Sequence, residues 1–309
     1  MNNRQRTLAL LKTLAPQEGY NLTALPDVRI LRSDRPLART PVLYDPGIVI
    51  VCQGTKRGFF GDQIYLYDEQ HYLAVAVPVP FTMETEATAE HPLLAIYMHL
   101  DFTVATDLLL QLEQQAVPVE VKAAQSMMSS PMDATLRDVV LRLVETLNDP
   151  LDAAILGPER VRELYYRVLT GAQGQAMRAA LTLHGQFGKI GKALRHIHAR
   201  YAQPLSLSAL AAEAGMSVPT FHTHFKNITR QPPMQYVKSV RLHQARMLML
   251  RQTVTAAAAS HAVGYESASQ FNREFKRLFG LPPAEEIKRM QRHFAIPPAQ
   301  QDMAFVSSH

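Results

Sequence analysis

The spacing of apolar residues divides the chain into a first part typical of β-strands and a second part typical of helices. Leu8, Leu11 and Leu14 predict a short helix within residues 1–20. Between about residues 25 and 105, short apolar, β-branched or aromatic runs alternate with turn residues, which predicts an antiparallel β-sandwich or barrel. The predicted strands are 28–31, 48–51, 56–60, 63–67, 72–77 and 93–98.

After Asp101 the apolar residues recur with a helical period. The clearest helix opens at Pro131, and its apolar stripe consists of Leu136, Val139, Val140, Leu143, Val144 and Leu147. Further helices are expected over 106–115, 158–170 and 175–199, the last one interrupted near 185–191. These stripes fit either packing against the barrel or docking on the same helices of a second copy, and the sequence leaves both open.

A repeat of about 50 residues lies within residues 204–290. Gly215 and Gly264 are 49 residues apart, and the pairs Phe221/Phe271, Phe225/Phe275 and Lys226/Lys276 are each 50 residues apart. Each copy follows a stretch rich in small residues, which lets two helices cross closely. The repeat therefore predicts two similar helical units in tandem.

Each unit has the sequence pattern of a helix-turn-helix. Gly215 and Gly264 suit a turn with a left-handed backbone, and Ser217 and Ser267 suit the N-cap of the second helix. The Phe pairs bury one face of that helix. The stretch between the units, 234–251, spans ~27 Å as a helix. Such a spacer would place the two second helices ~34 Å apart, in successive major grooves of DNA.

The faces opposite the Phe pairs carry residue types that contact phosphates and base edges. The expected DNA-binding residues are Ser217, Pro219, Thr220, His222, Thr223 and Lys226 in the first unit, and Ser267, Ser269, Gln270, Asn272, Arg273 and Lys276 in the second. We expect base-edge contacts from His222, Thr223, Gln270 and Arg273. Ser217, Thr220, Lys226 and Lys276 are expected to position the phosphate backbone.

This pattern resembles the AraC/XylS family of transcriptional regulators. The resemblance rests on 210–226, with Ala214-Gly215-Met216-Ser217, on Pro233, Tyr236 and Arg241 between the units, and on 263–283, with Val263-Gly264-Tyr265 and Phe279-Gly280. The front half resembles the sensor domain of one subgroup, through 32–36, 53–56, 61–68, 90–94, 156–158 and 162–167.

The resemblance implies a two-domain α+β fold. Its N-terminal part would be an antiparallel cupin-like β-barrel with trailing helices, and its C-terminal part an all-α double helix-turn-helix. The expected domains are 1–185 for sensing and dimerisation, with the barrel over 25–105 and helices over 106–185, and 190–292 for DNA binding. The two units would span 207–228 and 255–278, and 295–309 would form a flexible tail.

Three residues depart from the family pattern. Arg230 stands where Gly is usual after the first recognition helix, so we expect a strained or reshaped C-cap there. Ala259 replaces a large aliphatic residue and Glu286 replaces Tyr, which predicts looser packing of the second unit.

Charge is distributed unevenly along the chain. Residues 1–185 carry 16 basic and 21 acidic side chains, a net charge of −5, whereas residues 186–309 carry 16 basic and 6 acidic side chains, a net charge of +10. This asymmetry indicates a polyanion-binding module joined to a module for self-interaction or a neutral partner.

Other chemistry has weaker support. His71, His91 and His99 lack the His-x-His spacing of a metal-binding cupin, and His196-x-His198 and His222-x-His224 would point apart on helices. Cys52 is the only cysteine; it is expected to be a small buried hydrophobe, with a thiol sensor as the alternative. Arg32, Arg35, Lys56 and Arg57 fit a solvated rim or a site for an anionic effector.

We therefore expect a cytoplasmic, dimeric, sequence-specific DNA-binding transcription regulator, not an enzyme, with no cofactor and no metal. The expected partners are double-stranded promoter DNA, a second copy, an unidentified small effector in the N-terminal domain, and RNA polymerase if the protein is an activator. No membrane partner is expected, because no run reaches ~18 apolar residues.

Two alternatives remain open at this point. One is a small-molecule-binding or catalytic cupin-like protein that a basic DNA-binding domain merely localises. The other is an alkyl-transfer repair protein with Cys52 as the acceptor, although no acid–base set lies near this residue in the sequence.

Overall fold

A computed structural model describes residues 2–115, 124–182, 186–252 and 254–293. Its N-terminal part contains two antiparallel sheets. The larger sheet has the order β1-β2-β9-β4-β7-β10 and the smaller has the order β3-β8-β5-β6. The strands are β1 Gly19–Leu22, β2 Val28–Ser33, β3 Leu37–Tyr44, β4 Gly47–Gln53, β5 Thr55–Phe60, β6 Gln63–Tyr67, β7 His71–Val75, β8 Val79–Glu86, β9 Leu93–His99 and β10 Met127–Pro131.

The two sheets form a sandwich, one of the two architectures that the strand pattern predicted, and not the cupin-like barrel that the resemblance implied. Strands β1 and β10 end one sheet and β3 and β6 end the other, and no ladder joins these edges within the described residues. All six strands predicted from the sequence are present, whereas β1, β3, β8 and β10 were not predicted. Strands β3 and β8 contain Pro41 and Pro80, and β10 lies within a stretch expected to be helical.

Aromatic side chains from both sheets meet in the space between them. Tyr44 packs edge-on against Phe81 of its own sheet at 4.7 Å and against Tyr97 of the larger sheet at 6.0 Å between ring centroids. Lys56 of β5 is 1% exposed and pairs in register with Tyr67 and Thr85. Burial lowers the pKa of Lys56 to about 7, because no charged partner within the described residues offsets its desolvation.

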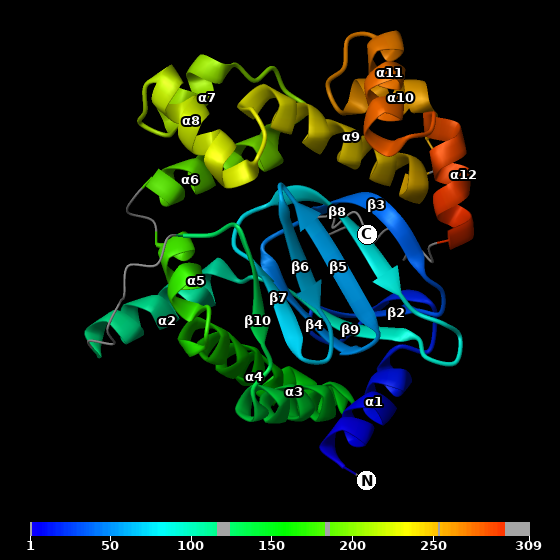
Figure 1. Ribbon diagram of the computed structural model, residues 1–309, viewed down its shortest axis with the longest axis vertical. Helices are drawn as coiled ribbons and strands as arrows, with labels where there is room; N and C mark the ends of the chain where they lie inside the picture. The colour runs from blue at the N-terminus through cyan, green and yellow to red at the C-terminus, as the bar shows by residue number, and fades with distance from the viewer. Residues whose placement is uncertain (1, 116–123, 183–185, 253, 294–309) are drawn as a thin grey trace.

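Helices cover the outer face of the larger sheet (Figure 1). They are α1 Asn3–Leu14, α2 Phe102–Gln114, α3 Ala134–Leu147, α4 Pro150–Thr170 and α5 Gly174–Leu181. The apolar stripe predicted in α3 is buried. Helix α4 starts at Pro150, eight residues before the expected start at Pro158, because Asp149 caps it and Pro158 is accommodated inside it.

The C-terminal part is helical throughout its described residues. Its helices are α6 Gln186–Arg200, α7 Leu207–Glu213, α8 Val218–Thr229, α9 Pro233–Gln252, α10 Ala256–Ala262, α11 Ala268–Phe279 and α12 Pro283–His293. The break expected near 185–191 does not cross α6, which runs through Gly188 and Gly191. The expected tail, 295–309, lies outside the described residues.

Helix α9 joins the two halves of the C-terminal part and lies against the sandwich (Figure 1). The Tyr236 hydroxyl donates to the carbonyl of Pro78 at 2.8 Å, and Arg246 donates to the carbonyl of Pro41 at 3.0 Å. A continuous buried cluster extends from the sandwich to Phe221, Phe225 and the first part of α9. The C-terminal helical part is therefore packed on the N-terminal part.

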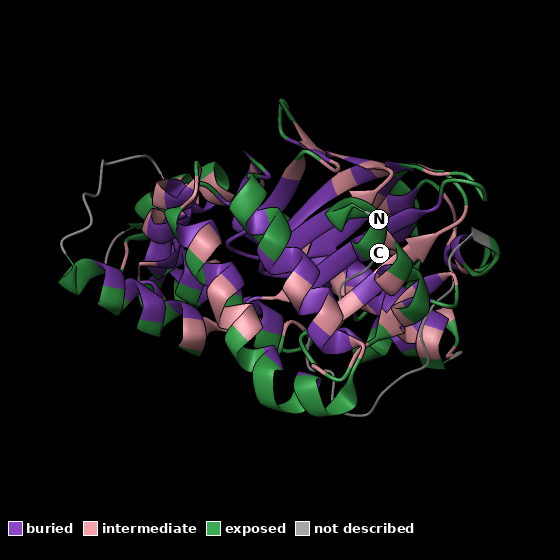
Figure 2. Ribbon diagram, turned by 90° about the horizontal axis from the view of Figure 1, so that it is seen from below, coloured by how far each residue is buried: buried purple, intermediate pink, exposed green. Residues whose placement is uncertain are grey.

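Burial follows this architecture (Figure 2). Strands β4, β7, β8 and β9 are buried over most of their length, whereas β1, β2 and β6 are mostly half-buried or exposed, and the helices alternate between buried and exposed residues. Among the described residues, no helix is both long and apolar enough to span a membrane.

Replacing the buried lysine tests this description of the interior. In the folded protein Lys56 deprotonates near pH 7 instead of near its usual 10.5, so the unfolded chain binds more protons between these values. Lys56 therefore makes the free energy of unfolding increase as the pH rises from about 7 to 10.5, by up to about 1.4 kcal/mol per pH unit. We expect Lys56→Met to be more stable than the wild type at pH 7, with a difference that shrinks towards pH 10.

Urea unfolding of both proteins at pH 7, 8 and 9 measures this difference. A constant difference across the series would show that Lys56 keeps its ordinary pKa in the folded protein.

Candidate nucleic-acid interface

The first helix-turn-helix unit consists of α7, a turn at Gly215 and α8. Gly215 has φ +61°, and an added Cβ would meet no atom within 4 Å, so backbone conformation alone requires glycine here. The Ser217 hydroxyl accepts from the Thr220 amide and begins α8, as predicted. Phe221 and Phe225 are both fully buried, with ring centroids 5.3 Å apart.

The second unit, α10 and α11, repeats this construction. Gly264 has φ +85°, and an added Cβ would lie 2.3 Å from the carbonyl oxygen of Ala202, so both conformation and space require glycine. The Ser267 hydroxyl accepts from the Gln270 amide at the start of α11. Phe271 and Phe275 are fully buried with centroids 5.5 Å apart. The predicted caps, turns and aromatic pairs are thus confirmed in both units.

The residues predicted to contact DNA lie on the outer surface of the two units. Ten of the twelve are exposed, and the other two, His222 and Gln270, are half-buried. Equivalent positions form matching stripes on the two second helices: Pro219, Thr223 and Lys226 on α8, and Ser269, Arg273 and Lys276 on α11. Each stripe follows the i, i+4, i+7 spacing of one helix face.

Local hydrogen bonds limit what some of these side chains can offer to DNA. The Thr223 hydroxyl donates to the Pro219 carbonyl at 3.1 Å, which leaves its oxygen to accept and its methyl group to pack. The Ser217 and Thr220 hydroxyls are 2.8 Å apart at the start of α8. These two hydroxyls therefore form part of the cap and lie where a phosphate can approach the helix N-terminus.

Glu274 is a residue of this interface that the sequence did not single out. Its carboxylate accepts from Lys238 at 2.8 Å, from the Tyr265 hydroxyl at 2.8 Å and from Gln270 at 3.2 Å. Partial burial acts to raise the pKa of Glu274, but the three hydrogen bonds outweigh it and hold the pKa below its usual range. Glu274 thus orients Gln270, whose carbonyl oxygen and second amide hydrogen remain for a base.

Arg241 is a second residue whose role only the structure reveals. Its guanidinium donates to three backbone carbonyls, those of Tyr201 at 2.7 Å, Gln203 at 2.9 Å and Gly264 at 3.0 Å. One side chain of α9 therefore ties the end of α6 to the turn of the second unit. The family resemblance includes this arginine, but spacing alone carried no signal for its three acceptors.

The three departures from the family pattern have distinct outcomes. Arg230 keeps the left-handed C-cap with φ +58°, equivalent to Gly280 with φ +83°, so the expected strain is present. Ala259 is fully buried in the core of the second unit. Glu286 is also fully buried and pairs with Arg246 at 3.5 Å and with Arg289 at 2.8 Å, so looser packing is wrong at this position.

The remaining candidate residues separate in space. His196 pairs with Glu213, whereas His198 is buried against the Tyr236 hydroxyl at 2.7 Å, and burial lowers the pKa of His198 to about 4. Arg57 points outward to Glu84 and Glu86, while its neighbour Lys56 points inward. No group of three potential metal ligands occurs among the residues that the structure describes.

Fold and site together define a class of protein: a double helix-turn-helix module packed on a β-sandwich domain. The family described as AraC-type transcriptional regulator N-terminus matches residues 24–176, and a helix-turn-helix domain family matches residues 210–289. The chain belongs to the AraC family of transcriptional regulators.

Individual relatives agree with this assignment. A putative AraC-like transcription regulator of Streptomyces lividans is 31% identical over 99 residues, covering 32% of this chain and 33% of that protein. The HTH-type transcriptional regulator AlkR of Acinetobacter baylyi is 32% identical over 95 residues, covering 31% of each chain. The chain thus spans about a third of the length of these curated relatives.

A solved structure supports the fold over nearly the whole chain. ToxT from Vibrio cholerae superposes with a TM-score of 0.59, at 9% identity, over 88% of this chain and 99% of that one. At this identity the likeness shows the fold, and the two-domain α+β class predicted from the sequence is confirmed.

The strained C-cap at Arg230 provides a stability test. Glycine adopts this backbone conformation without strain. Its greater conformational entropy in the unfolded chain offsets part of this gain. We therefore expect Arg230→Gly to raise the free energy of unfolding by about 1 kcal/mol. Arg230→Ala is the matched control, because it removes the same side chain but keeps the strain. Equal stabilities of the Gly and Ala variants in urea unfolding would contradict a strained cap.

Proposed function

We propose that this protein is a sequence-specific DNA-binding transcription regulator of the AraC type. The observation that carries the proposal is the pair of matching exposed stripes on α8 and α11, each opposite a buried Phe pair. In this proposal residues 190–292 bind promoter DNA, and residues 1–185 sense an effector and dimerise. The basic C-terminal half supplies phosphate affinity that falls as salt rises.

Within the interface we assign direct base contacts to His222, Thr223, Gln270 and Arg273. Arginine suits guanine and glutamine suits adenine, because each can form two hydrogen bonds to one base edge. Glu274 supports this role for Gln270 by holding its amide in place. The remaining predicted residues, Ser217, Pro219, Thr220, Lys226, Ser267, Ser269, Asn272 and Lys276, are assigned to the phosphate backbone or to shape.

Arg273→Ala tests base reading. We expect a loss of ~1–3 kcal/mol on the cognate site and relaxed specificity at one base position, with little change on random DNA at equal salt. Sites selected from random DNA provide the cognate sequence, and fluorescence anisotropy measures the affinities. Lys276→Ala is the comparison, since loss of a phosphate contact weakens binding to all DNA sequences about equally. The same uniform loss of affinity for Arg273→Ala would show that Arg273 does not contact a base.

Dimerisation is proposed through α4. Leu151 and Ile155 lie one turn apart on this helix and are 71% and 67% exposed. Leu156 and Tyr166 on the same helix are also exposed. An exposed apolar strip on a helix that already buries its opposite side is typical of a surface that docks on a partner. We assign the strip to a second copy of the chain, because a two-fold dimer sets two identical apolar strips against each other.

Ile155→Asp tests this surface. We expect the variant to sediment as a monomer at concentrations where the wild type is dimeric, because an aspartate would be desolvated in an apolar interface. Leu110→Asp on α2, where the native leucine is 54% exposed, is the control and should remain dimeric. A monomeric wild type, or an unchanged dimer in the Ile155→Asp variant, would contradict the proposed interface.

The proposal extends to location and partners. The protein would act in the cytoplasm, respond to a small effector held by its N-terminal domain, and contact RNA polymerase if it activates transcription. A ToxT structure contains a bound unsaturated fatty acid, which supports a ligand-binding role for the similar N-terminal fold. The regulators among the relatives support a non-enzymatic role over the catalytic alternative. Burial raises the pKa of Cys52 to about 12, which disfavours it as an alkyl acceptor or thiolate sensor.

A further inference from the structure

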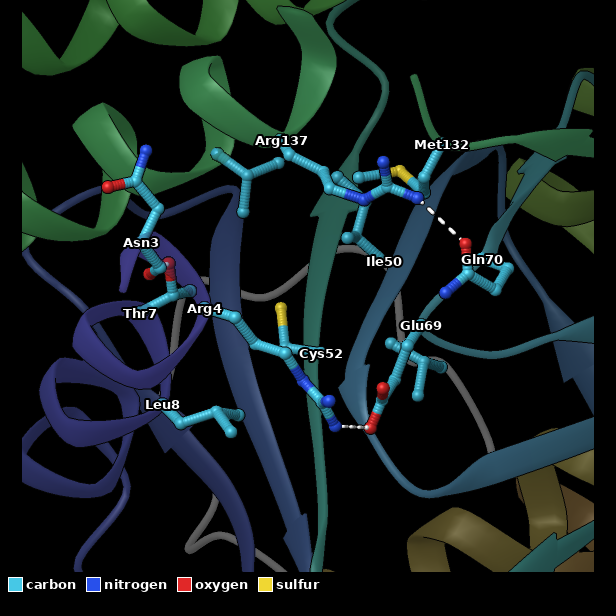
Figure 3. A pocket seen from close by; sticks show the side chains of 12 residues that line it. Asn3, Arg4, Thr7, Leu8, Ile50, Cys52, Glu69, Gln70, Met132 and Arg137 are labelled. Carbon is cyan, nitrogen blue, oxygen red and sulfur yellow. Dashed lines mark hydrogen bonds and ion pairs between the residues drawn. The ribbon is translucent and has the colours of Figure 1, made fainter. Parts of the chain in front are cut away.

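A cavity of about 150 Å³ lies on the outer face of the larger sheet, away from the space between the sheets (Figure 3). Its walls come from four elements: α1, the strand β4, the β6–β7 turn and α3. Ile50 and Cys52 of β4 form the floor, and Leu8 and Val140 close the apolar sides. The larger sheet separates this cavity from Tyr97, which faces the opposite way, towards Tyr44.

The polar rim of the cavity carries an excess positive charge. Arg4 of α1 pairs with Glu69 at 2.5 Å across the opening. Arg137 of α3 donates only to the neutral Gln70 side chain, at 2.8 Å, and has no carboxylate partner among the described residues. Two guanidiniums and one carboxylate therefore leave one positive charge uncompensated.

The floor contributes no charge that could balance Arg137. Cys52 carries a thiol pointing into the cavity (Figure 3), and burial together with the nearby Glu69 carboxylate raises its pKa to about 12. The thiol is uncharged at neutral pH and acts as a small polarisable apolar surface. An apolar floor also gives water few partners, so the cavity favours an apolar body over ordered water.

From this arrangement we propose that the cavity binds a small monocarboxylate, with the carboxylate on Arg137 and a short apolar chain against Ile50, Cys52 and Val140. A guanidinium binds a carboxylate through two parallel hydrogen bonds, which a point charge cannot do. A cavity of this volume holds a body of about six carbon atoms. A single negative charge matches the excess of one positive charge, whereas a dicarboxylate would leave a second carboxylate on the apolar floor.

Helix α1 forms the lid of this site. Besides the Arg4–Glu69 pair, Asn3 donates to Asp138 of α3 at 3.2 Å and Arg6 pairs with Glu145 of α3 at 2.8 Å. Ligand entry loosens these exposed contacts at modest cost, because surface ion pairs contribute little. Leu8 of α1 and Val140 of α3 both line the cavity, so an apolar chain bound between them holds the lid against α3.

Calorimetric titration of the full-length protein with the sodium salts of acetate to octanoate tests the site, with 1-butanol and succinate as comparison ligands. We expect one saturable event per chain for monocarboxylates of roughly four to six carbons, with Kd on the order of 1 mM or tighter. Butanol and succinate should not saturate. Arg137→Gln should weaken binding at least tenfold, as expected for loss of a charge-assisted contact.

Two further variants keep the test specific. Arg142→Gln, on α3 but paired with Glu163 outside the cavity, should bind as the wild type does. Cys52→Leu should block binding by filling the floor, and its unchanged thermal midpoint would show that the fold is intact.

Three outcomes would overturn the proposal: no saturable binding by any carboxylate, equal binding of butanol, or unchanged binding by Arg137→Gln. Loss of binding in Lys56→Met with retention in Arg137→Gln would likewise overturn it, by placing the ligand between the sheets. The site lies apart from the DNA-facing helices, so its failure leaves the proposed DNA binding untouched.

Discussion

The arrangement of this protein depends on the burial of helix α9. This helix contacts both helix-turn-helix units, α12 and the sandwich, so twelve of its residues are buried, on almost every side. A helix in that position must satisfy each polar group it buries. Tyr236 does so with His198 and the Pro78 carbonyl, and Arg246 with Glu286 and the Pro41 carbonyl. These contacts fix how α9 packs on the N-terminal part, and α9 in turn sets where α8 and α11 lie.

The two units are alike in sequence pattern but differ in their surroundings. The first unit touches the sandwich half directly: Ser126 donates to the Ile228 carbonyl at 2.6 Å, and the Arg230 side chain lies against the turn at Gly61. The turn of the second unit is tied to α6 through Arg241. A shift of the sandwich relative to α9 therefore acts on the end of α8 through these contacts and on α11 through its contact with β3. These contacts give an effector a physical route to α8 and α11, provided that it binds the two arrangements with different affinity.

Positively charged side chains lie in three different environments in this molecule. Arg273 and Lys276 are exposed, and in the proposed interface Arg273 contacts a base edge while Lys276 contacts a phosphate. Arg246 is fully buried and is compensated by Glu286 and by the Phe279 ring, 4.2 Å from its guanidinium carbon. Lys56 is buried without such compensation, and its pKa falls accordingly. The net charge of the chain shows none of these differences, because they depend on burial and neighbours.

The sequence by itself determined the parts of the protein that depend on local chemistry. Gly215 and Gly264 specify the turns, and Ser217 and Ser267 specify where the second helices start. The Phe pairs specify the buried faces of those helices. Both helix-turn-helix units, and the exposed stripes on α8 and α11, could therefore be predicted. The six strands with clear apolar runs could be predicted for the same reason, since alternation and turn residues act over a few positions.

Only the tertiary structure decided the features that join residues distant in the chain. Strands β3 and β8 accommodate their prolines because β3 is an edge strand and because Pro80 lies before the part of β8 that pairs with β5. Which elements pack together also decides that the sandwich is open. The same packing brings three backbone carbonyls to the Arg241 guanidinium and the Glu274 carboxylate to Gln270. Lys56 is buried and Arg57 points outward because one face of β5 packs against the other sheet. Packing across the whole sandwich determines which face that is.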